Sequence, residues 1–217
     1  VDLGGFYLDI IKDRLYTTPA SSAARRSAQT AMYHITEAMV RWLAPILSFT
    51  AEEIWHAMPG TRAASVMLAV WHPLPEPPGS EVDWELFGAL KADVARELEL
   101  LRVAGTIGAP LEAEVDIYCT AQDIVKLSGL GDELRFVLIT SAARVHVVDQ
   151  PPLGSTGASA TVAKGGASGG VWLQVTATDK AKCVRCWHHR DDVGHDPRHP
   201  EICGRCVTNI ETAGEVR

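Results

Sequence analysis

Cys183-Val184-Arg185-Cys186 is followed, after sixteen intervening residues, by Cys203-Gly204-Arg205-Cys206. Each Cys-x-x-Cys turn lets two sulfur atoms converge on one centre, and two such turns complete a tetrahedron of thiolates around zinc. Gly204 suits the second turn, because a tight backbone knuckle often requires a positive φ. Zinc held by four cysteines has no open position for water or substrate. The sequence therefore predicts one structural zinc per chain, bound by Cys183, Cys186, Cys203 and Cys206, and no catalytic metal.

Three other interpretations of these cysteines fit the sequence less well. Paired disulfides are typical of small secreted chains, whereas this chain has 217 residues and an odd number of cysteines, five. A redox site needs only one Cys-x-x-Cys, near a βαβ pattern. A Cys₂His₂ set that used His195 and His199 would leave the second cysteine pair unexplained. We therefore expect His188, His189, His195 and His199 to be solvated loop residues. Cys119 lies in an apolar run, which predicts a buried core thiol.

The composition is that of an ordinary globular protein, with 47% hydrophobic and 22% charged residues. No apolar run approaches the roughly 18 residues needed to cross a bilayer, so we expect no membrane association. Cysteines in a metal pattern indicate the reducing cytoplasm. The formal net charge of −7 does not favour wholesale binding to phosphate, so any contact with nucleic acid must be local. The chain begins at Val1 in mid-pattern, which we interpret as a piece of a longer protein.

Helical periodicity dominates the first hundred residues. Residues 5–15 carry apolar side chains at helical spacing, and residues 25–47 form the clearest helix, which Pro45 should kink or end. Thr50 and Glu53 have the spacing of a capping box that opens a short helix. Asp83 is a plausible cap for a further helix that reaches about residue 101, and residues 66–70 are read as extended. The sequence predicts an antiparallel α-bundle over residues 1–106.

After Gly105 the apolar period changes to two, which predicts a small α/β domain over residues 107–178. Its expected strands are 113–119, 143–148 and 171–175, and its expected short helices are 122–130 and 132–138. The glycine- and serine-rich stretch 154–170 is predicted to be a flexible loop. Residues 179–217 form the zinc module, which has too few large apolar side chains to fold without its metal.

Several stretches together resemble bacterial isoleucyl-tRNA synthetases of class I. Phe6 to Tyr16 is similar to the helix after the catalytic half of those enzymes. Arg41 to Trp55 looks like their anticodon-domain bundle, of which the valine and leucine relatives share a looser form. Gly108 to Ala113 matches the entry to their small α/β domain, and Lys182 to Trp187, with the second cysteine pair, is similar to their C-terminal zinc motif. The resemblance covers essentially the whole chain.

This resemblance implies a mainly α protein, in which a helical bundle of the class I anticodon-binding type precedes the α/β domain and the Cys₄ module. It implies the tRNA-recognition region of a cytoplasmic, monomeric enzyme that attaches isoleucine to its tRNA with ATP. The family's His-x-Gly-His and Lys-Met-Ser-Lys-Ser elements and its editing domain do not occur in this sequence. We therefore expect the chain alone to be catalytically inactive and assign no catalytic residue.

Recognition of an anticodon loop requires aromatic platforms for unstacked bases and cations for phosphates. Trp187 is predicted to be such a platform, although its indole would equally well cover the zinc knuckle. Arg185 and Arg205 are predicted to reach phosphates, with salt bridges as the alternative. A basic cluster, which a merely solvated face would also explain, is expected where the first two helices meet and comprises Lys12, Arg14, Arg25 and Arg26. The competing function is an independent zinc-ribbon and helical-bundle module that binds a protein partner.

Overall fold

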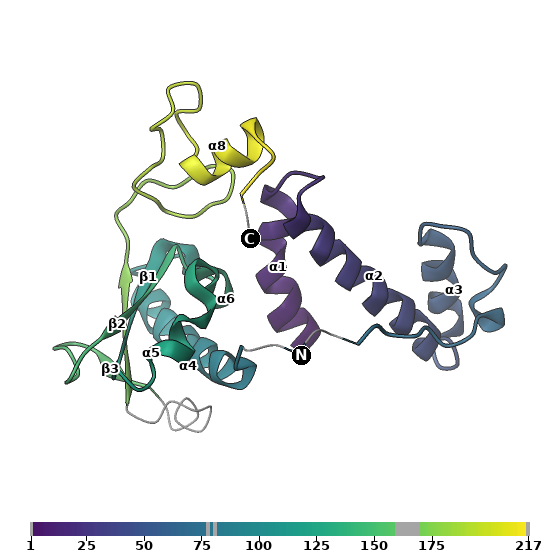
Figure 1. Cartoon of the computed structure of the whole chain (residues 1–217), viewed down its shortest axis with the longest axis horizontal. Helices are drawn as coiled ribbons and strands as arrows, with labels where there is room; N and C mark the ends of the chain where they lie inside the picture. Colours follow the sequence, from purple (N-terminus) through teal and green to yellow (C-terminus); the bar gives the residue numbers. More distant parts are fainter. Residues whose placement is uncertain (1, 77–78, 80–81, 159–169, 216–217) are drawn as a thin grey trace.

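The computed structural model describes residues 2–76, 79, 82–158 and 170–215 (Figure 1). The described chain is about half helical, with a small mixed sheet and a cluster of cysteines near its C-terminal end. In chain order the helices are a π-helical turn Asp2–Leu8, α1 Asp9–Thr17, α2 Ala23–Leu43, α3 Ser48–Ala57, α4 Trp84–Val103, α5 Ile124–Leu127, α6 Leu134–Leu138 and α8 Gly204–Glu211. The strands are β1 Ala113–Cys119, β2 Ala142–Val147, β3 Thr156–Gly157 and β4 Val171–Ala177. Short 3₁₀ turns occupy Val66–Leu68, Pro110–Glu112 and Ser128–Glu133.

Helices α2 and α3 and the turn Val66–Leu68 form a helical arm that extends away from the sheet (Figure 1). Ser22 begins α2, because its hydroxyl oxygen accepts a hydrogen bond from the backbone N–H of Arg25 at 3.3 Å. The helix ends at Leu43, two residues before Pro45, as the proline predicts. The arm has a core of its own, formed by Val40, Ala44, Ala51, Trp55 and Val66.

Two local predictions in the arm are wrong. Helix α3 begins at Ser48, with Leu47 as its uncapped N-cap residue, so Thr50 lies within the helix and cannot form the capping box. The segment read as extended starts with a 3₁₀ turn instead, in which Ser65 accepts from the backbone N–H of Met67. The Glu52 carboxylate also accepts from the N–H of Val66 at 3.1 Å and holds this turn against α3.

Helix α4 packs against the sheet and not within the arm. Asp83 caps it as predicted, accepting from the N–H of Leu86 at 3.0 Å. Its apolar stripe, which includes Phe87 and Leu90, is fully buried in the same core as Val115. The sequence placed this helix in the bundle because helical periodicity identifies a buried side but not the partner of that side. The predicted bundle arrangement and the boundary at residue 106 stay predictions.

The described strands form a sheet in the order β2-β1-β4-β3. Strand β1 pairs in parallel with β2, and helices α5 and α6 make the crossover between them. Strands β1 and β4 are antiparallel, as are β4 and β3. One side of β1 is buried against the helices and includes Cys119, which confirms the predicted core thiol. Burial raises the pKa of this thiol.

Most of the predicted loop 154–170 lies outside the described residues, and Thr156–Gly157 within it form the edge strand β3. Among the helices that the structure describes, none combines the length and the apolar character needed to span a membrane.

Candidate metal centre and the seam around it

The four predicted zinc ligands come together in one buried cluster. All four sulfur atoms lie within 4.8 Å of one another. The Sγ atoms of Cys183 and Cys206 are 3.7 Å apart, and so are those of Cys186 and Cys203. These separations are far too long for disulfides, which are about 2.0 Å. Zinc–sulfur bonds of roughly 2.3 Å in a tetrahedron give sulfur–sulfur edges of about 3.8 Å, so the cluster fits zinc.

The charges of the cluster also fit a divalent cation. Neighbouring thiols that donate to its sulfur lower the pKa of Cys186, with Cys183 as the main donor. Hydrogen bonding to Cys183, Cys186 and Cys203, followed by burial, raises the pKa of the Cys206 thiol. Without a cation the four groups cannot all ionise, whereas zinc compensates their charge. The backbone N–H of Cys203, 3.4 Å from the sulfur of Cys183, adds a donor to the thiolates.

Arg205 docks the cysteine module on α1. Its side chain is only 7% exposed, and its two terminal nitrogens donate to the Asp13 carboxylate at 2.8 Å each. Glu215 accepts a further bond at 3.1 Å, and the guanidinium lies over the Phe136 ring at 5.1 Å. Burial lowers the pKa of Arg205, but Asp13 and Glu215 outweigh it and raise the pKa above its usual range. Arg205 is predicted to contact phosphate, but in the structure its guanidinium is buried and pairs with Asp13, which is the alternative salt bridge.

Arg185 and two further contacts also join the cysteine module to the rest of the chain. The Arg185 guanidinium donates to the Thr17 carbonyl at 2.8 Å, at the end of α1. The backbone N–H of His189 donates to the Ser141 hydroxyl at 2.7 Å, beside β2. Gly214, with φ of 96°, approaches Pro19 so closely that a Cβ would lie 2.6 Å from its ring. A larger residue at Gly214 would push the C-terminal segment off the turn between α1 and α2.

Trp187 is exposed, so its indole does not bury itself over the zinc knuckle. Its side chain is 62% exposed, and it directly follows the ligand-turn residue Cys186. Its φ of 67° lies in the left-handed region, which glycine adopts at far lower cost. His188, expected to be a solvated loop residue, is buried instead, because its ring packs against Phe136 with ring centres 5.3 Å apart.

The predicted basic cluster divides into exposed and engaged members. Arg14 pairs with Glu133 at 3.0 Å, and Arg25 donates to the Thr18 carbonyl at 3.4 Å. Lys12 is exposed on α1 beside Asp9, and Arg26 is exposed on α2. Two of the four cations thus face solvent, where they can meet an anionic partner.

Sequence periodicity gave no sign of a buried ion cluster in the arm. Glu37, 2% exposed, contacts Arg41 at 2.5 Å and Arg62 at 2.6 Å. Both guanidinium groups also lie over the Trp55 ring, at 4.7 and 4.9 Å from its centre. Only the Glu37–Arg41 spacing of four residues was a local signal, and that spacing is common on solvated helix faces.

Two segments of the chain match known families. Residues 1–117 match the family described as the anticodon-binding domain of tRNA ligase. Residues 181–209 match the family described as the zinc finger found in FPG and IleRS. The helical region and the cysteine module are therefore those of a tRNA-ligase anticodon-binding region that carries a zinc finger. Because the first match covers 117 of the 217 residues, the chain belongs to the family of anticodon-binding domains of tRNA ligases. The sulfur geometry and the zinc-finger match agree on a structural zinc cofactor.

The whole chain is similar to proteins named isoleucine–tRNA ligase. It is 53% identical to the one from Halorhodospira halophila over 221 residues and 55% identical to the one from Azotobacter vinelandii over 221 residues. Identity to the Pseudomonas putida protein is 56% over 223 residues. Each comparison covers 100% of this chain and 23% of the relative. The chain thus spans about a quarter of the length of the curated relatives it matches.

Proposed function

We propose that this chain is the tRNA-recognition region of an isoleucine–tRNA ligase. The observation that carries the proposal is the similarity of 51–56% identity, over the whole chain, to proteins of that name. The enzyme that contains this region attaches isoleucine to its tRNA at the expense of ATP, acts as a monomer and works in the cytoplasm. This chain contributes binding and not catalysis, because it carries neither of the family's catalytic sequence elements.

The proposed organisation has three domains, and the family matches to residues 1–117 and 181–209 support its two ends. Residues 1–106 act as the anticodon-binding helical bundle, residues 107–178 as the small α/β domain, and residues 179–217 as the zinc module. The zinc is structural, and its ligands are Cys183, Cys186, Cys203 and Cys206, supported by their sulfur separations. Buried thiolates leave no open coordination site, so the metal fixes the knuckle and does not contact the tRNA.

The proposed tRNA contacts are the exposed members of the predicted set. Trp187 offers its face to an unstacked base, and Lys12 and Arg26 offer their charges to phosphates. Arg14 and Arg25 are half-buried, so they contribute at most peripheral contacts to the tRNA. Arg185 and Arg205 act indirectly, because their guanidinium groups hold the knuckle against α1.

The test is a filter-binding titration of the zinc-loaded chain with isoleucine tRNA and with an unrelated tRNA, at several salt concentrations. We expect preferential binding of isoleucine tRNA and a steep loss of affinity as salt rises, since cations released from phosphates drive binding. The double variant Lys12→Gln/Arg26→Gln should reduce the salt slope by about 2, roughly 1 per lost phosphate contact. Arg102→Gln, which removes a charge from the exposed Arg102–Glu99 pair on α4, is the matched control. Equal binding of both tRNAs, or of neither, would refute the proposal and favour a protein-interaction module.

A further inference from the structure

A small cavity of about 170 Å³ lies between α4 and the C-terminal end of α6. Pockets for small molecules usually begin at roughly 300 Å³, so this one can hold only a ligand of a few heavy atoms. One side of α4, the chain segment that follows it and the end of α6 together form the lining. None of the side chains proposed to contact tRNA lines this cavity.

Lys91 brings to this cavity a positive charge that no acceptor contacts. Its side chain lines the cavity, and its Nζ atom is buried and has no hydrogen-bond partner among the residues that the structure describes. The nitrogen lies 5.1 Å from the centre of the Phe6 ring, which attracts the cation but offers it no acceptor oxygen. A buried ammonium without an acceptor is costly, so an anionic ligand would supply what the site lacks.

The carboxylates nearest to Lys91 are already engaged with other cations. Asp9 accepts from Lys12 at 3.0 Å, and Glu99 accepts from Arg102 at 2.6 Å. Burial lowers the pKa of Lys91, and the attraction of Asp9 compensates this effect only in part. With both pairs neutral, the cavity keeps one unpaired positive charge, that of Lys91.

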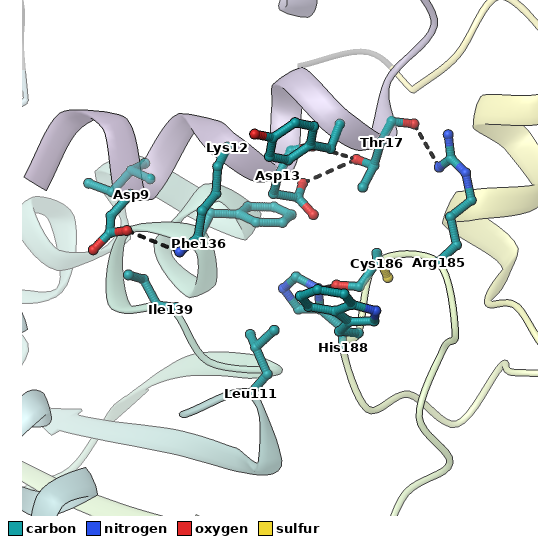
Figure 2. A pocket seen from close by; sticks show the side chains of 13 residues that line it. Asp9, Lys12, Asp13, Thr17, Leu111, Phe136, Ile139, Arg185, Cys186 and His188 are labelled. Atoms are coloured by element: carbon teal, nitrogen blue, oxygen red, sulfur yellow. Dashed lines mark hydrogen bonds and ion pairs between the residues drawn. The ribbon is translucent and has the colours of Figure 1, made fainter. Parts of the chain in front are cut away.

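Most of the remaining lining is aliphatic. Three of its side chains are almost fully buried, those of Leu98, Ile107 and Leu138. Ile139 is a fourth, and it also lines the larger hollow drawn in Figure 2, together with Asp9 and Lys12. The cavity therefore combines one cation with walls that suit a hydrocarbon chain.

Ile139 holds a backbone conformation that is unusual for a β-branched residue. Its φ of 58° is one of two positive values among the non-glycine residues that the structure describes. Glycine would adopt this conformation at far lower cost at the end of α6. Backbone strain of this kind clusters at ligand sites, where the surrounding fold enforces it. Its position on the cavity is therefore a second indication of a binding site.

We propose that this cavity binds a short aliphatic carboxylate, whose charged end pairs with Lys91 and whose carbon chain packs against Ile107 and Ile139. One unpaired ammonium matches one negative charge, whereas a phosphate dianion would keep half of its charge uncompensated. At about 30 Å³ per heavy atom, the share of a water molecule in the liquid, the cavity holds roughly six heavy atoms, as in butanoate. The inference does not rest on the proposed function.

The test is a titration of the zinc-loaded chain with butanoate at constant ionic strength, followed by methyl NMR. The methyl signals of Ile107, Leu138 and Ile139 should shift and saturate, whereas those of Val40, in the core of the arm, should not move. Butanamide, which has the same carbon chain but no charge, should bind at least roughly ten-fold more weakly, because hydrogen bonds between charged groups are the stronger ones.

Lys91→Met removes the ammonium and keeps an apolar side chain beside the Phe6 ring. It should weaken butanoate binding by roughly ten-fold or more. It should not lower the melting temperature, since the substitution also removes a buried charge that has no acceptor. Lys126→Met, which removes an exposed lysine from α5, is the matched control and should bind butanoate as wild type does.

Ala95→Trp is the second variant, because it keeps Lys91 and fills the cavity from an exposed position on α4. It should abolish butanoate binding, whereas Leu100→Trp, at a position 62% exposed on the same helix, should not. Binding that is lost in both variants and kept in both controls supports the inference. Absence of saturable shifts in wild type, equal binding of butanamide, or unchanged binding by Lys91→Met overturns it and leaves the proposed function standing.

Discussion

Some single residues stabilise this fold through ion pairs with residues far away in the sequence, and no local sequence pattern predicts these pairs. Arg205 was expected to reach phosphate because it lies inside a cysteine turn, yet it meets Asp13, 192 positions earlier in the chain. Nothing in the sequence near either residue predicts this pairing, since only the fold brings α1 beside the knuckle. By contrast, the convergence of the four cysteines was predictable, because the spacing of the two Cys-x-x-Cys turns alone encodes it.

The Asp13–Arg205 pair should hold the zinc module on α1. Replacing Arg205 by Leu leaves the Asp13 carboxylate, 13% exposed, without its main partner. We expect a loss of about 3–5 kcal/mol in the free energy of unfolding, the usual cost of breaking a buried pair. Urea denaturation measures this loss, and zinc content should stay at one per chain because Arg205 is not a ligand.

A double-mutant cycle with Asp13→Asn separates the pair from general disruption. The two substitutions should be non-additive by roughly 1–3 kcal/mol, since each removes the same contact. Fully additive losses would mean that Asp13 and Arg205 stabilise the fold independently of each other.

Glu37 should make the stability of the arm depend on pH. Burial alone would raise the pKa of Glu37, but hydrogen bonds from Arg62 and Arg41 outweigh burial and lower the pKa to about 2. A lowered pKa stabilises the fold above the ordinary value near 4.5, and the contribution is lost as pH falls from there toward 2. The contribution is on the order of 3 kcal/mol at neutral pH.

Urea denaturation at pH 7 and pH 3 tests this dependence. Wild type should lose more free energy of unfolding between the two values than Glu37→Gln, which has no carboxyl group to protonate. Glu53→Gln, which removes an exposed carboxylate from α3, is the control, and its stability should depend on pH as that of wild type does. Identical pH profiles for wild type and Glu37→Gln would show that the buried cluster does not carry the effect.

At the scale of elements, the sequence predicts a strand where apolar and polar residues alternate, and a helix where apolar residues recur at helical spacing. Strand β1 was expected at 113–119 and is found at Ala113–Cys119, because its inward residues meet a core and its outward residues do not. The start of α3 was misplaced, because the helix gains a first turn through the Leu47 carbonyl, which accepts from Ala51 at 2.8 Å. Backbone bonding of this kind needs no side-chain signature.

The zinc module, residues 179–217, should need its metal to fold. Its buried core consists of the four cysteines and Ile202, too little apolar surface to offset the entropy of ordering the segment. Cys203→Ser should lose zinc on dialysis against a chelator, whereas Cys119→Ala, which removes the thiol of β1, should retain one zinc per chain. Elemental analysis measures both, and cobalt substitution should show an all-sulfur shell.

Oxygen or nitrogen donors in the cobalt spectrum would contradict the four-sulfur assignment. Full zinc retention by Cys203→Ser under the same dialysis would contradict it as well. The segment's amide hydrogens provide a further check, since they should exchange rapidly once the metal is removed and remain protected in Cys119→Ala.

At the scale of the whole molecule, the chain is built from separate cores that meet at α1. The arm has its core around Val40 and Trp55, while α4 and the sheet share another around Val115 (Figure 1). Helix α1 contacts α2 on one side and α6 on the other. Helical periodicity predicted the helices of both parts but could not divide them, because the same apolar stripe serves an arm or a sheet.

Separate cores should open separately. Val40→Ala removes two buried carbons from the arm, at a cost on the order of 2 kcal/mol, and that loss should appear only in the hydrogen exchange of α2 and α3. Val115→Ala is the matched change in the sheet and should lower protection of β1, β4 and α4 while sparing the arm. Exchange followed residue by residue distinguishes the two patterns. If either variant lost hydrogen-exchange protection uniformly, the two cores would unfold as one cooperative unit, coupled through α1.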